Sequence, residues 1–143
     1  MGGSEVGHQV VRVNGRRCTC GRRGCLEAYV SVPAFIRAAE EATGRILTPT
    51  EIFRGAAMGN SGLQETVEQY EEILGTGIVN IVNMFRPQLI LLGGAMSGHV
   101  QDMIGPIRAM MKRDCFGGEH GTIPEIAAAE LGSSAGMIGA ANL

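Results

Sequence analysis

The strongest constraint on this chain is a group of three cysteines within eight residues, Cys18, Cys20 and Cys25, preceded by a histidine, His8. The N-terminus has no basic region followed by an apolar stretch, so no export signal is expected and metal binding is favoured over disulfides. One imidazole and three thiolates complete the tetrahedral shell that zinc prefers. Because no coordination position stays open, we expect a structural zinc. Reduced thiols, a redox pair and another metal are the alternatives.

Glycines and carboxylates accompany these ligands. Gly21 and Gly24 let the loop turn tightly enough for three sulfurs to reach one ion. Glu5 and Glu27 lie just outside the ligands on either side. Zinc binding can supply roughly 10–16 kcal/mol of apparent free energy, enough to order a loop with almost no core. We therefore expect the metal to hold the segments that carry Glu5 and Glu27.

The rest of the chain alternates helical and strand patterns. Apolar residues in 62–85 recur at the 3.6-residue spacing of a helix. The apolar run 88–92 predicts a strand buried on both faces, as in a parallel sheet. The expected elements are a strand over 9–13, a helix over 26–43 with Ser31 as a cap, a helix over 51–58 opened by Thr50, a helix over 62–85 opened by Ser61, a strand over 88–92, a helix over 99–112, a strand over 126–129 and a helix over 135–141. This order predicts the α/β class, and 143 residues suffice for one domain.

A second candidate site is Gly93-Gly94, directly after the strand predicted over 88–92. Bare backbone N–H groups at the carboxyl end of a parallel strand lie where open α/β sheets bind ligands. Taken alone, two glycines after a strand are also typical of a simple tight turn.

The motif Glu5-x-Gly7-His8, followed by Cys18-x-Cys20-Gly21-x-x-Gly24-Cys25-Leu26-Glu27, closely resembles the signature of the ROK family of repressors, open reading frames and sugar kinases. The whole chain looks like the C-terminal half of such a protein. The resemblance implies an α/β fold that is part of an actin-like, ribonuclease H-like ATPase lobe with a zinc-binding loop. It divides residues 1–143, taken as a truncated C-terminal lobe, into a sugar and zinc motif at 1–27, a helical segment at 28–86 and a βαβα nucleotide-side segment at 87–143.

The resemblance also implies roles for single residues. The implied zinc ligands are His8, Cys18, Cys20 and Cys25, and the implied contacts to sugar hydroxyls are Glu5, His8 and Glu27. The chemistry agrees, because carboxylates accept hydrogen bonds from hydroxyls and a zinc-bound histidine keeps its second ring nitrogen free. For Glu27 the alternative is a carboxylate that merely favours a helix start.

On the nucleotide side, the resemblance implies a motif formed by Gly93, Gly94 and Ala95. The family usually has a third glycine where Ala95 stands, which weakens the expectation of close phosphate contact there. Residues 131–136 resemble the last turn of the family, and we assign them no catalytic role.

What the chain lacks bears on its function. A ROK sugar kinase needs an aspartate base and an Asp-x-Gly-x-Thr loop for the phosphates and Mg²⁺. The only aspartates here are Asp102 and Asp114, so we expect those parts upstream in a longer parent. The leading hypothesis is the C-terminal part of an ATP-dependent hexose kinase of glucokinase type. The alternatives are the effector domain of a ROK repressor, with a DNA-binding helix-turn-helix upstream, and a non-catalytic, zinc-stabilised sugar-binding remnant.

The partners expected on this basis are a structural Zn²⁺ and a hexose or N-acetylhexosamine for this chain, with ATP and Mg²⁺ in the complete parent. Nucleic acid is expected only for a repressor. No run of 18 apolar residues predicts a membrane span, and we expect a cytoplasmic location. A bare sheet surface at 88–92 and 126–129 predicts oligomers or poor solubility.

The net charge and its distribution further limit the classes of partner that the chain could bind. The formal net charge of −2 excludes a chain-wide electrostatic footprint for nucleic acid or membranes. Arginines nevertheless gather in residues 1–25, where a solvated loop face and an anion contact are the two interpretations. They are Arg12, Arg16, Arg17, Arg22 and Arg23, against Glu5 alone.

Overall fold

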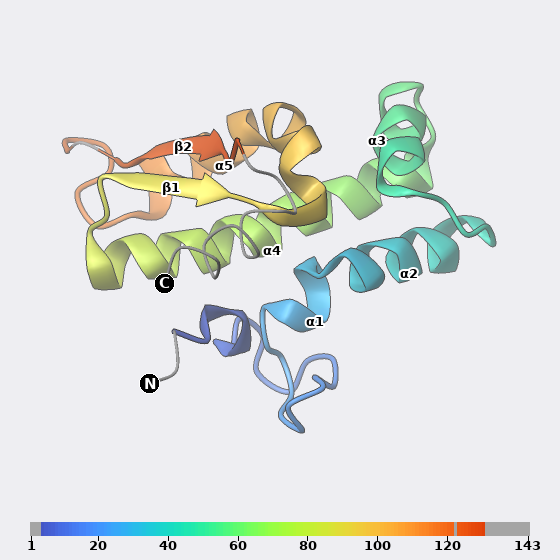
Figure 1. The fold of residues 1–143 in the computed structure, drawn as a ribbon, viewed down its shortest axis with the longest axis horizontal. Helices are drawn as coiled ribbons and strands as arrows, with labels where there is room; N and C mark the ends of the chain where they lie inside the picture. The colour runs from blue at the N-terminus through green and yellow to red at the C-terminus, as the bar shows by residue number, and fades with distance from the viewer. Residues whose placement is uncertain (1–3, 122, 131–143) are drawn as a thin grey trace.

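The computed structural model describes residues 4–121 and 123–130, which form helices packed against a small parallel sheet (Figure 1). The architecture is mixed α/β, as predicted. The elements are the 3₁₀ helices η1 (Val6–His8) and η2 (Gly94–His99), the α-helices α1 (Glu27–Val30), α2 (Val32–Thr43), α3 (Pro49–Ala57), α4 (Ser61–Phe85) and α5 (Val100–Asp114), and the strands β1 (Leu89–Leu92) and β2 (Glu125–Ala128).

The long helix α4 is the centre of the fold. It packs against α1, α2, α3 and α5, and in Figure 1 the strands lie above it and the N-terminal loop below it. The Asn60 side chain accepts a hydrogen bond of 3.0 Å from the Leu63 N–H and caps the helix, one residue before the predicted Ser61. The helix ends at Phe85, because Arg86 turns into the left-handed region ahead of Pro87.

The predicted helix over 26–43 is two helices, α1 and α2, so that boundary was wrong. Ser31 adopts an extended conformation between them, and its hydroxyl accepts from the Ala34 N–H at the start of α2. Pro33 at the first turn of α2 favours the same break, since proline starts helices well and continues them poorly. The helix ends at Thr43, because Gly44 adopts the left-handed conformation.

The next helix, α3, begins earlier than predicted. A capping box between Thr48 and Glu51 opens it, with each side chain bonded to the other residue's backbone N–H, rather than Thr50. The charge-assisted bonds from Thr48 lower the pKa of the Glu51 carboxyl.

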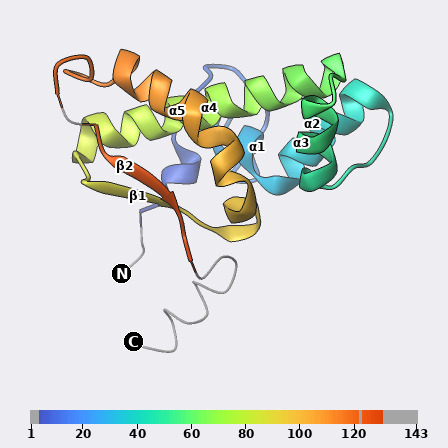
Figure 2. The ribbon, with the colours of Figure 1, turned by 90° about the horizontal axis from the view of Figure 1, so that it is seen from above.

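The strands β1 and β2 pair in parallel, with Leu89 opposite Glu125 and Leu92 opposite Ala128. They are joined through η2 and α5, which return the chain across one face of the sheet (Figure 2). The prediction that β1 is buried on both faces was wrong. Leu89 and Leu91 are 48% and 57% exposed, because the helices of the described residues cover only the face that carries Ile90 and Leu92.

Two further expectations need correction. Residues 9–13 form bends and the start of a turn, not a strand. The pairing within this segment is one isolated bridge between Val10 and Cys25, because the Val11 and Arg12 N–H groups both donate to the Gly24 carbonyl. The predicted helix over 135–141 and the turn at 131–136 lie outside the described residues. Among the helices that the structure describes, none is long and apolar enough to cross a membrane.

Candidate functional site

The cysteine loop folds back on itself through short backbone contacts. The Cys18 N–H donates to the Arg22 carbonyl (2.8 Å), and the Gly24 N–H donates to the Arg16 carbonyl (2.8 Å). Gly24 has a φ of 80°, and a Cβ at this position would overlap the Arg12 carbonyl oxygen. Only glycine fits here, so the fold of the cysteine loop depends on Gly24.

This folding brings the four predicted ligands together. The His8 Nδ1 atom lies 3.6 Å from the Cys18 Sγ atom, and the Sγ atoms of Cys20 and Cys25 are 3.7 Å apart. All four donor atoms lie within 4.8 Å of one another. A tetrahedral zinc with bonds of about 2.3 Å to sulfur separates its sulfur ligands by about 3.8 Å. The donor set and its spacing therefore fit a zinc ion.

The cysteines of this cluster differ in their acidity. Hydrogen bonds from the Arg22 backbone N–H and then from its guanidinium lower the pKa of Cys20 to about 6. Burial, followed by the neighbouring Cys20 and Cys18, raises the pKa of Cys25 to about 11. A metal ion at this site would need thiolates; Arg22 would favour that form at Cys20, whereas Cys25 would lose its proton only on binding the ion.

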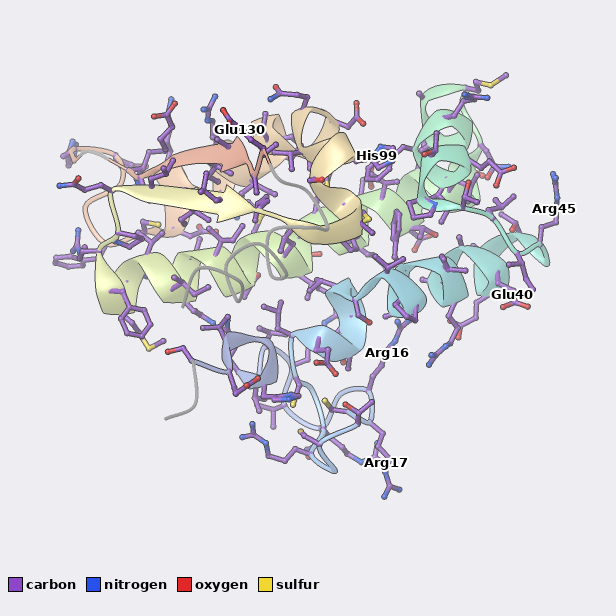
Figure 3. All side chains as sticks on the ribbon, viewed as in Figure 1. Arg16, Arg17, Glu40, Arg45, His99 and Glu130 are labelled. Atoms are coloured by element: carbon purple, nitrogen blue, oxygen red, sulfur yellow. The ribbon has the colours of Figure 1, made fainter. Side chains whose placement is uncertain are left out.

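Arg22 is a site residue that sequence reasoning missed. Its guanidinium also donates to the His8 carbonyl oxygen at 2.6 Å, so it ties two ligand-bearing segments together. The other arginines of the cluster are spread over the loop: Arg12 and Arg16 lie 5.7 and 5.3 Å from the Tyr29 ring centroid, and Arg17 extends away from the loop (Figure 3). The only sequence signal for Arg22 was its membership of that cluster.

The carboxylate of Glu27 lies beside the cluster at the first position of α1. Its Oε1 atom accepts a hydrogen bond of 2.9 Å from the Thr19 hydroxyl and lies 4.0 Å from the Cys18 Sγ atom. Cys18 thus contacts both His8 and Glu27. Glu5 precedes η1 with an exposed side chain, and its carbonyl accepts from the His8 N–H (3.0 Å).

Helix α4 anchors the loop to the body of the protein. The Gln9 amide donates to the Gly77 carbonyl (3.4 Å), and the Asn80 amide donates to the Gln9 Oε1 atom (2.9 Å). Leu26 packs onto Gly77, where an added Cβ would lie 2.6 Å from the Leu26 Cδ2 atom. The bare backbone of Gly77 therefore lets the loop approach α4 closely.

The Gly93-Gly94 turn lies close to the other end of α1. Gly94 has a φ of 80°, which suits glycine. A cavity of about 350 Å³ opens at this turn. Its lining comes from the segments Val30–Val32 and Leu91–Met96 together with Tyr70, Leu74, Val100 and Met103. The four-residue helix α1, about 6 Å long at 1.5 Å per residue, thus links Glu27 to the cavity beside Gly93, Gly94 and Ala95.

Comparison with known proteins identifies the family of this chain. The model of the ROK family matches residues 2–143. The chain is 29% identical to the glucokinase of Streptomyces coelicolor, over 98% of this chain and 50% of that protein. It is 32% identical to the N-acetylgalactosamine kinase AgaK of a Shewanella species, over 97% of this chain and 47% of that one, and 26% identical to the xylose repressor of Bacillus subtilis, over 97% and 36%.

Solved structures of ROK family proteins have a similar fold. A ROK family glucokinase from Streptomyces griseus, in complex with glucose and AMPPNP, superposes with a TM-score of 0.83 at 29% identity, over 97% of this chain and 50% of that one. A ROK hexokinase from Thermus thermophilus gives a TM-score of 0.78 at 30% identity, over 98% and 47%. The chain therefore spans about half the length of the glucokinases that it matches.

Proposed function

The chain belongs to the ROK family, and from this premise we propose that it is the sugar-binding and zinc-binding part of an ATP-dependent hexose kinase of glucokinase type. In this proposal, residues 1–27 hold the sugar and the zinc, residues 28–86 form the helical body, and residues 87–143 form the nucleotide side. The substrate class is a hexose or N-acetylhexosamine, and ATP with Mg²⁺ is the phosphoryl donor of the complete protein.

The observation that carries the proposal is the position of α1 between the two candidate sites. Phosphoryl transfer depends on placing a sugar hydroxyl next to the terminal phosphate, so the two sites must be close and held rigidly. Glu27 begins α1, and the segment at its other end lines the cavity at Gly93 and Gly94. A sugar at Glu27 and a nucleotide at Gly93 and Gly94 would be about one helical turn apart.

The zinc would be held by His8 Nδ1 and the Sγ atoms of Cys18, Cys20 and Cys25, whose spacing fits a tetrahedral ion. With four protein ligands it supplies structural order, not an activated water. Because Nδ1 faces the cluster, Nε2 of His8 stays available for a sugar hydroxyl. Glu5 and Glu27 would accept hydrogen bonds from further hydroxyls and thereby fix the sugar for attack.

The proton of the attacking hydroxyl needs a base from outside this chain. Asp102 lies in the first turn of α5, and Asp114 ends that helix with both carboxylate oxygens bonded to Arg113 at 2.6 Å. Among the described residues, neither aspartate makes a polar contact with Glu27 or with the four candidate zinc ligands. In the proposed reaction, this chain binds and orients the sugar.

A sugar-sensing domain of a repressor is the second candidate. The match to the xylose repressor of Bacillus subtilis favours it. A ROK family transcriptional regulator also superposes on the chain, with a TM-score of 0.72 at 25% identity, over 86% of this chain and 34% of that one. The coding sequence upstream of Met1 separates the two. An in-frame Asp-x-Gly-x-Thr loop favours the kinase, and a helix-turn-helix favours the repressor.

Calorimetric titration of the zinc-loaded chain with glucose and N-acetylglucosamine tests the sugar site directly. We expect measurable binding that falls about tenfold or more in Glu27→Gln, since the charged acceptor of a sugar hydroxyl is replaced by a neutral amide oxygen. Glu40→Gln, at an exposed position on α2 (Figure 3), is the matched control and should bind as the wild type does. If neither sugar binds, or if Glu27→Gln binds normally, the sugar site is wrong.

A further inference from the structure

We propose that Thr19 is a positioning residue that orients the Glu27 carboxylate for the sugar, an inference that rests on the proposed function. Thr19 lies between two zinc ligands in the sequence, Cys18 and Cys20, and its side chain is exposed. Its Oγ1 atom donates to the Glu27 Oε1 atom at 2.9 Å. The motif that identifies this loop does not specify position 19, so its residue had no assigned role.

The polar surroundings of Glu27 make this contact important. Among the described residues, the Glu27 carboxylate has two side-chain polar contacts, the Thr19 hydroxyl and the Cys18 sulfur at 4.0 Å. A thiol could donate weakly to the carboxylate, but a zinc-bound Cys18 is a thiolate without a proton. In the zinc-loaded protein, Thr19 is then the side-chain donor that remains to Glu27.

The Glu27 carboxylate also lies close to the negatively charged sulfur of Cys18. Three thiolates outweigh the two positive charges of a zinc ion, so the loaded cluster would carry a net charge of about −1 and would repel the Glu27 carboxylate, which lies 4.0 Å from the Cys18 Sγ atom. The Thr19 hydroxyl lies close to both groups, 2.9 Å from the Glu27 Oε1 atom and 3.9 Å from the Cys18 Sγ atom. Its proton, donated to Oε1, offsets the repulsion and holds the carboxylate in place.

The second carboxylate oxygen remains for the ligand. On that side lies Gly7, where an added Cβ would lie 3.9 Å from the Glu27 Oε2 atom and 3.6 Å from the Glu27 Cβ atom. Gly7 offers no side chain to bond Oε2. Thr19 therefore fixes one oxygen of Glu27 and leaves the other to accept from a sugar hydroxyl. Because its backbone is held by both flanking zinc ligands, the metal site and the sugar site share this one residue.

The test compares Thr19→Val, which keeps the shape but removes the donor, with Thr19→Ser, which keeps the donor. We expect the glucose affinity of the zinc-loaded chain, measured by calorimetry, to fall about three- to tenfold in Thr19→Val and to stay within about twofold in Thr19→Ser. The zinc content, measured by mass spectrometry of the metal, should equal that of the wild type in both. Thr76→Val is the control, because among the described residues the Thr76 hydroxyl donates to the Glu72 carbonyl of its own helix and to no group of the loop.

Three results overturn the proposal. If Thr19→Val binds glucose as the wild type does, the hydrogen bond does not orient Glu27. If Thr19→Val and Thr19→Ala both lose zinc, Thr19 serves the fold of the loop. If the wild type itself binds no sugar while zinc is retained, the sugar site of the proposed function is wrong and this inference falls with it; the wild-type titration separates that case from the first.

Discussion

Glu71 is a carboxyl group on α4 with only 9% of its surface exposed. Burial, and then the nearby Glu68 and Asp102, raises its pKa to about 7. His99, Asp102 and Arg54 line the same open cavity of about 460 Å³ that Glu71 faces. At neutral pH this side chain therefore titrates in the folded protein, although a free glutamate would be fully charged.

This raised pKa predicts a pH-dependent stability. The folded state binds the Glu71 proton more tightly than the unfolded state does. The contribution of Glu71 to the free energy of unfolding is therefore complete below pH 4.5 and is lost as the pH rises through about 7. Glutamine does not titrate, so this loss is absent in Glu71→Gln. We expect the free energy of unfolding of this variant to exceed that of the wild type by on the order of 1 kcal/mol at pH 8 and to equal it at pH 4.5. Urea unfolding at both pH values measures it, with the exposed Glu65→Gln as control. An equal gain at both pH values would contradict the assignment.

Residue roles in the loop were predictable to the extent that they depend on sequence spacing. The ligand set followed from three cysteines and a histidine because few other functions use that combination, and the structure brings these donors together. Arg22 and Thr19 could not be assigned in this way. Their roles depend on which atoms the folded loop places beside them, the His8 carbonyl and the Glu27 carboxylate.

At the scale of elements, the contact between Gly77 and Leu26 joins the loop to α4. Alanine in place of a helical glycine normally stabilises by about 1 kcal/mol. At Gly77 the added methyl would lie 2.6 Å from Leu26. Since overpacking costs about 1–3 kcal/mol, we expect Gly77→Ala to lower the free energy of unfolding by about 1 kcal/mol.

A double-mutant cycle with Leu26→Ala identifies the cause. If the clash with Leu26 is responsible, Gly77→Ala should cost about 1–2 kcal/mol less in the Leu26→Ala background than in the wild type. Denaturant unfolding of the four proteins, with zinc present throughout, gives the coupling. Additive effects would show that the loop does not press on α4 at this point.

Helix α4 was the easiest element to predict, because its apolar residues keep the helical spacing along a helix of 25 residues. The segment 9–13 was predicted wrongly because a short β-branched run has no ladder partner here; its N–H groups bond to Gly24. A local pattern indicates which conformation a segment favours, but pairing depends on what the rest of the chain places beside it.

At the scale of the whole molecule, the outer face of β1 is the surface most prone to association. Leu89 and Leu91 project from the face of the two-stranded sheet that the described helices leave uncovered, and Met84 and Phe85 at the end of α4 are also exposed. We expect light scattering to give a mass above 15.0 kDa that grows with protein concentration.

The double variant Leu89→Lys with Leu91→Lys should restore the monomer mass, because charges on this face oppose pairing. Ile46→Lys is the control, since Ile46 is an exposed apolar residue in the connection between α2 and α3. It should associate as the wild type does. A monodisperse wild-type monomer at all concentrations would contradict the prediction.

Because α1 is so short, it fixes the distance between the carboxylate of Glu27 and the turn at Gly93 and Gly94. Each residue of an α-helix advances the chain by about 1.5 Å and rotates it by about 100°. One alanine inserted within α1 would therefore turn Glu27 away from the cavity end by more than a quarter of a circle. In the proposed function, the four-residue length of α1 sets the distance between the sugar and the nucleotide, so we expect an insertion in α1 to impair activity more than one in the exposed connection between α2 and α3.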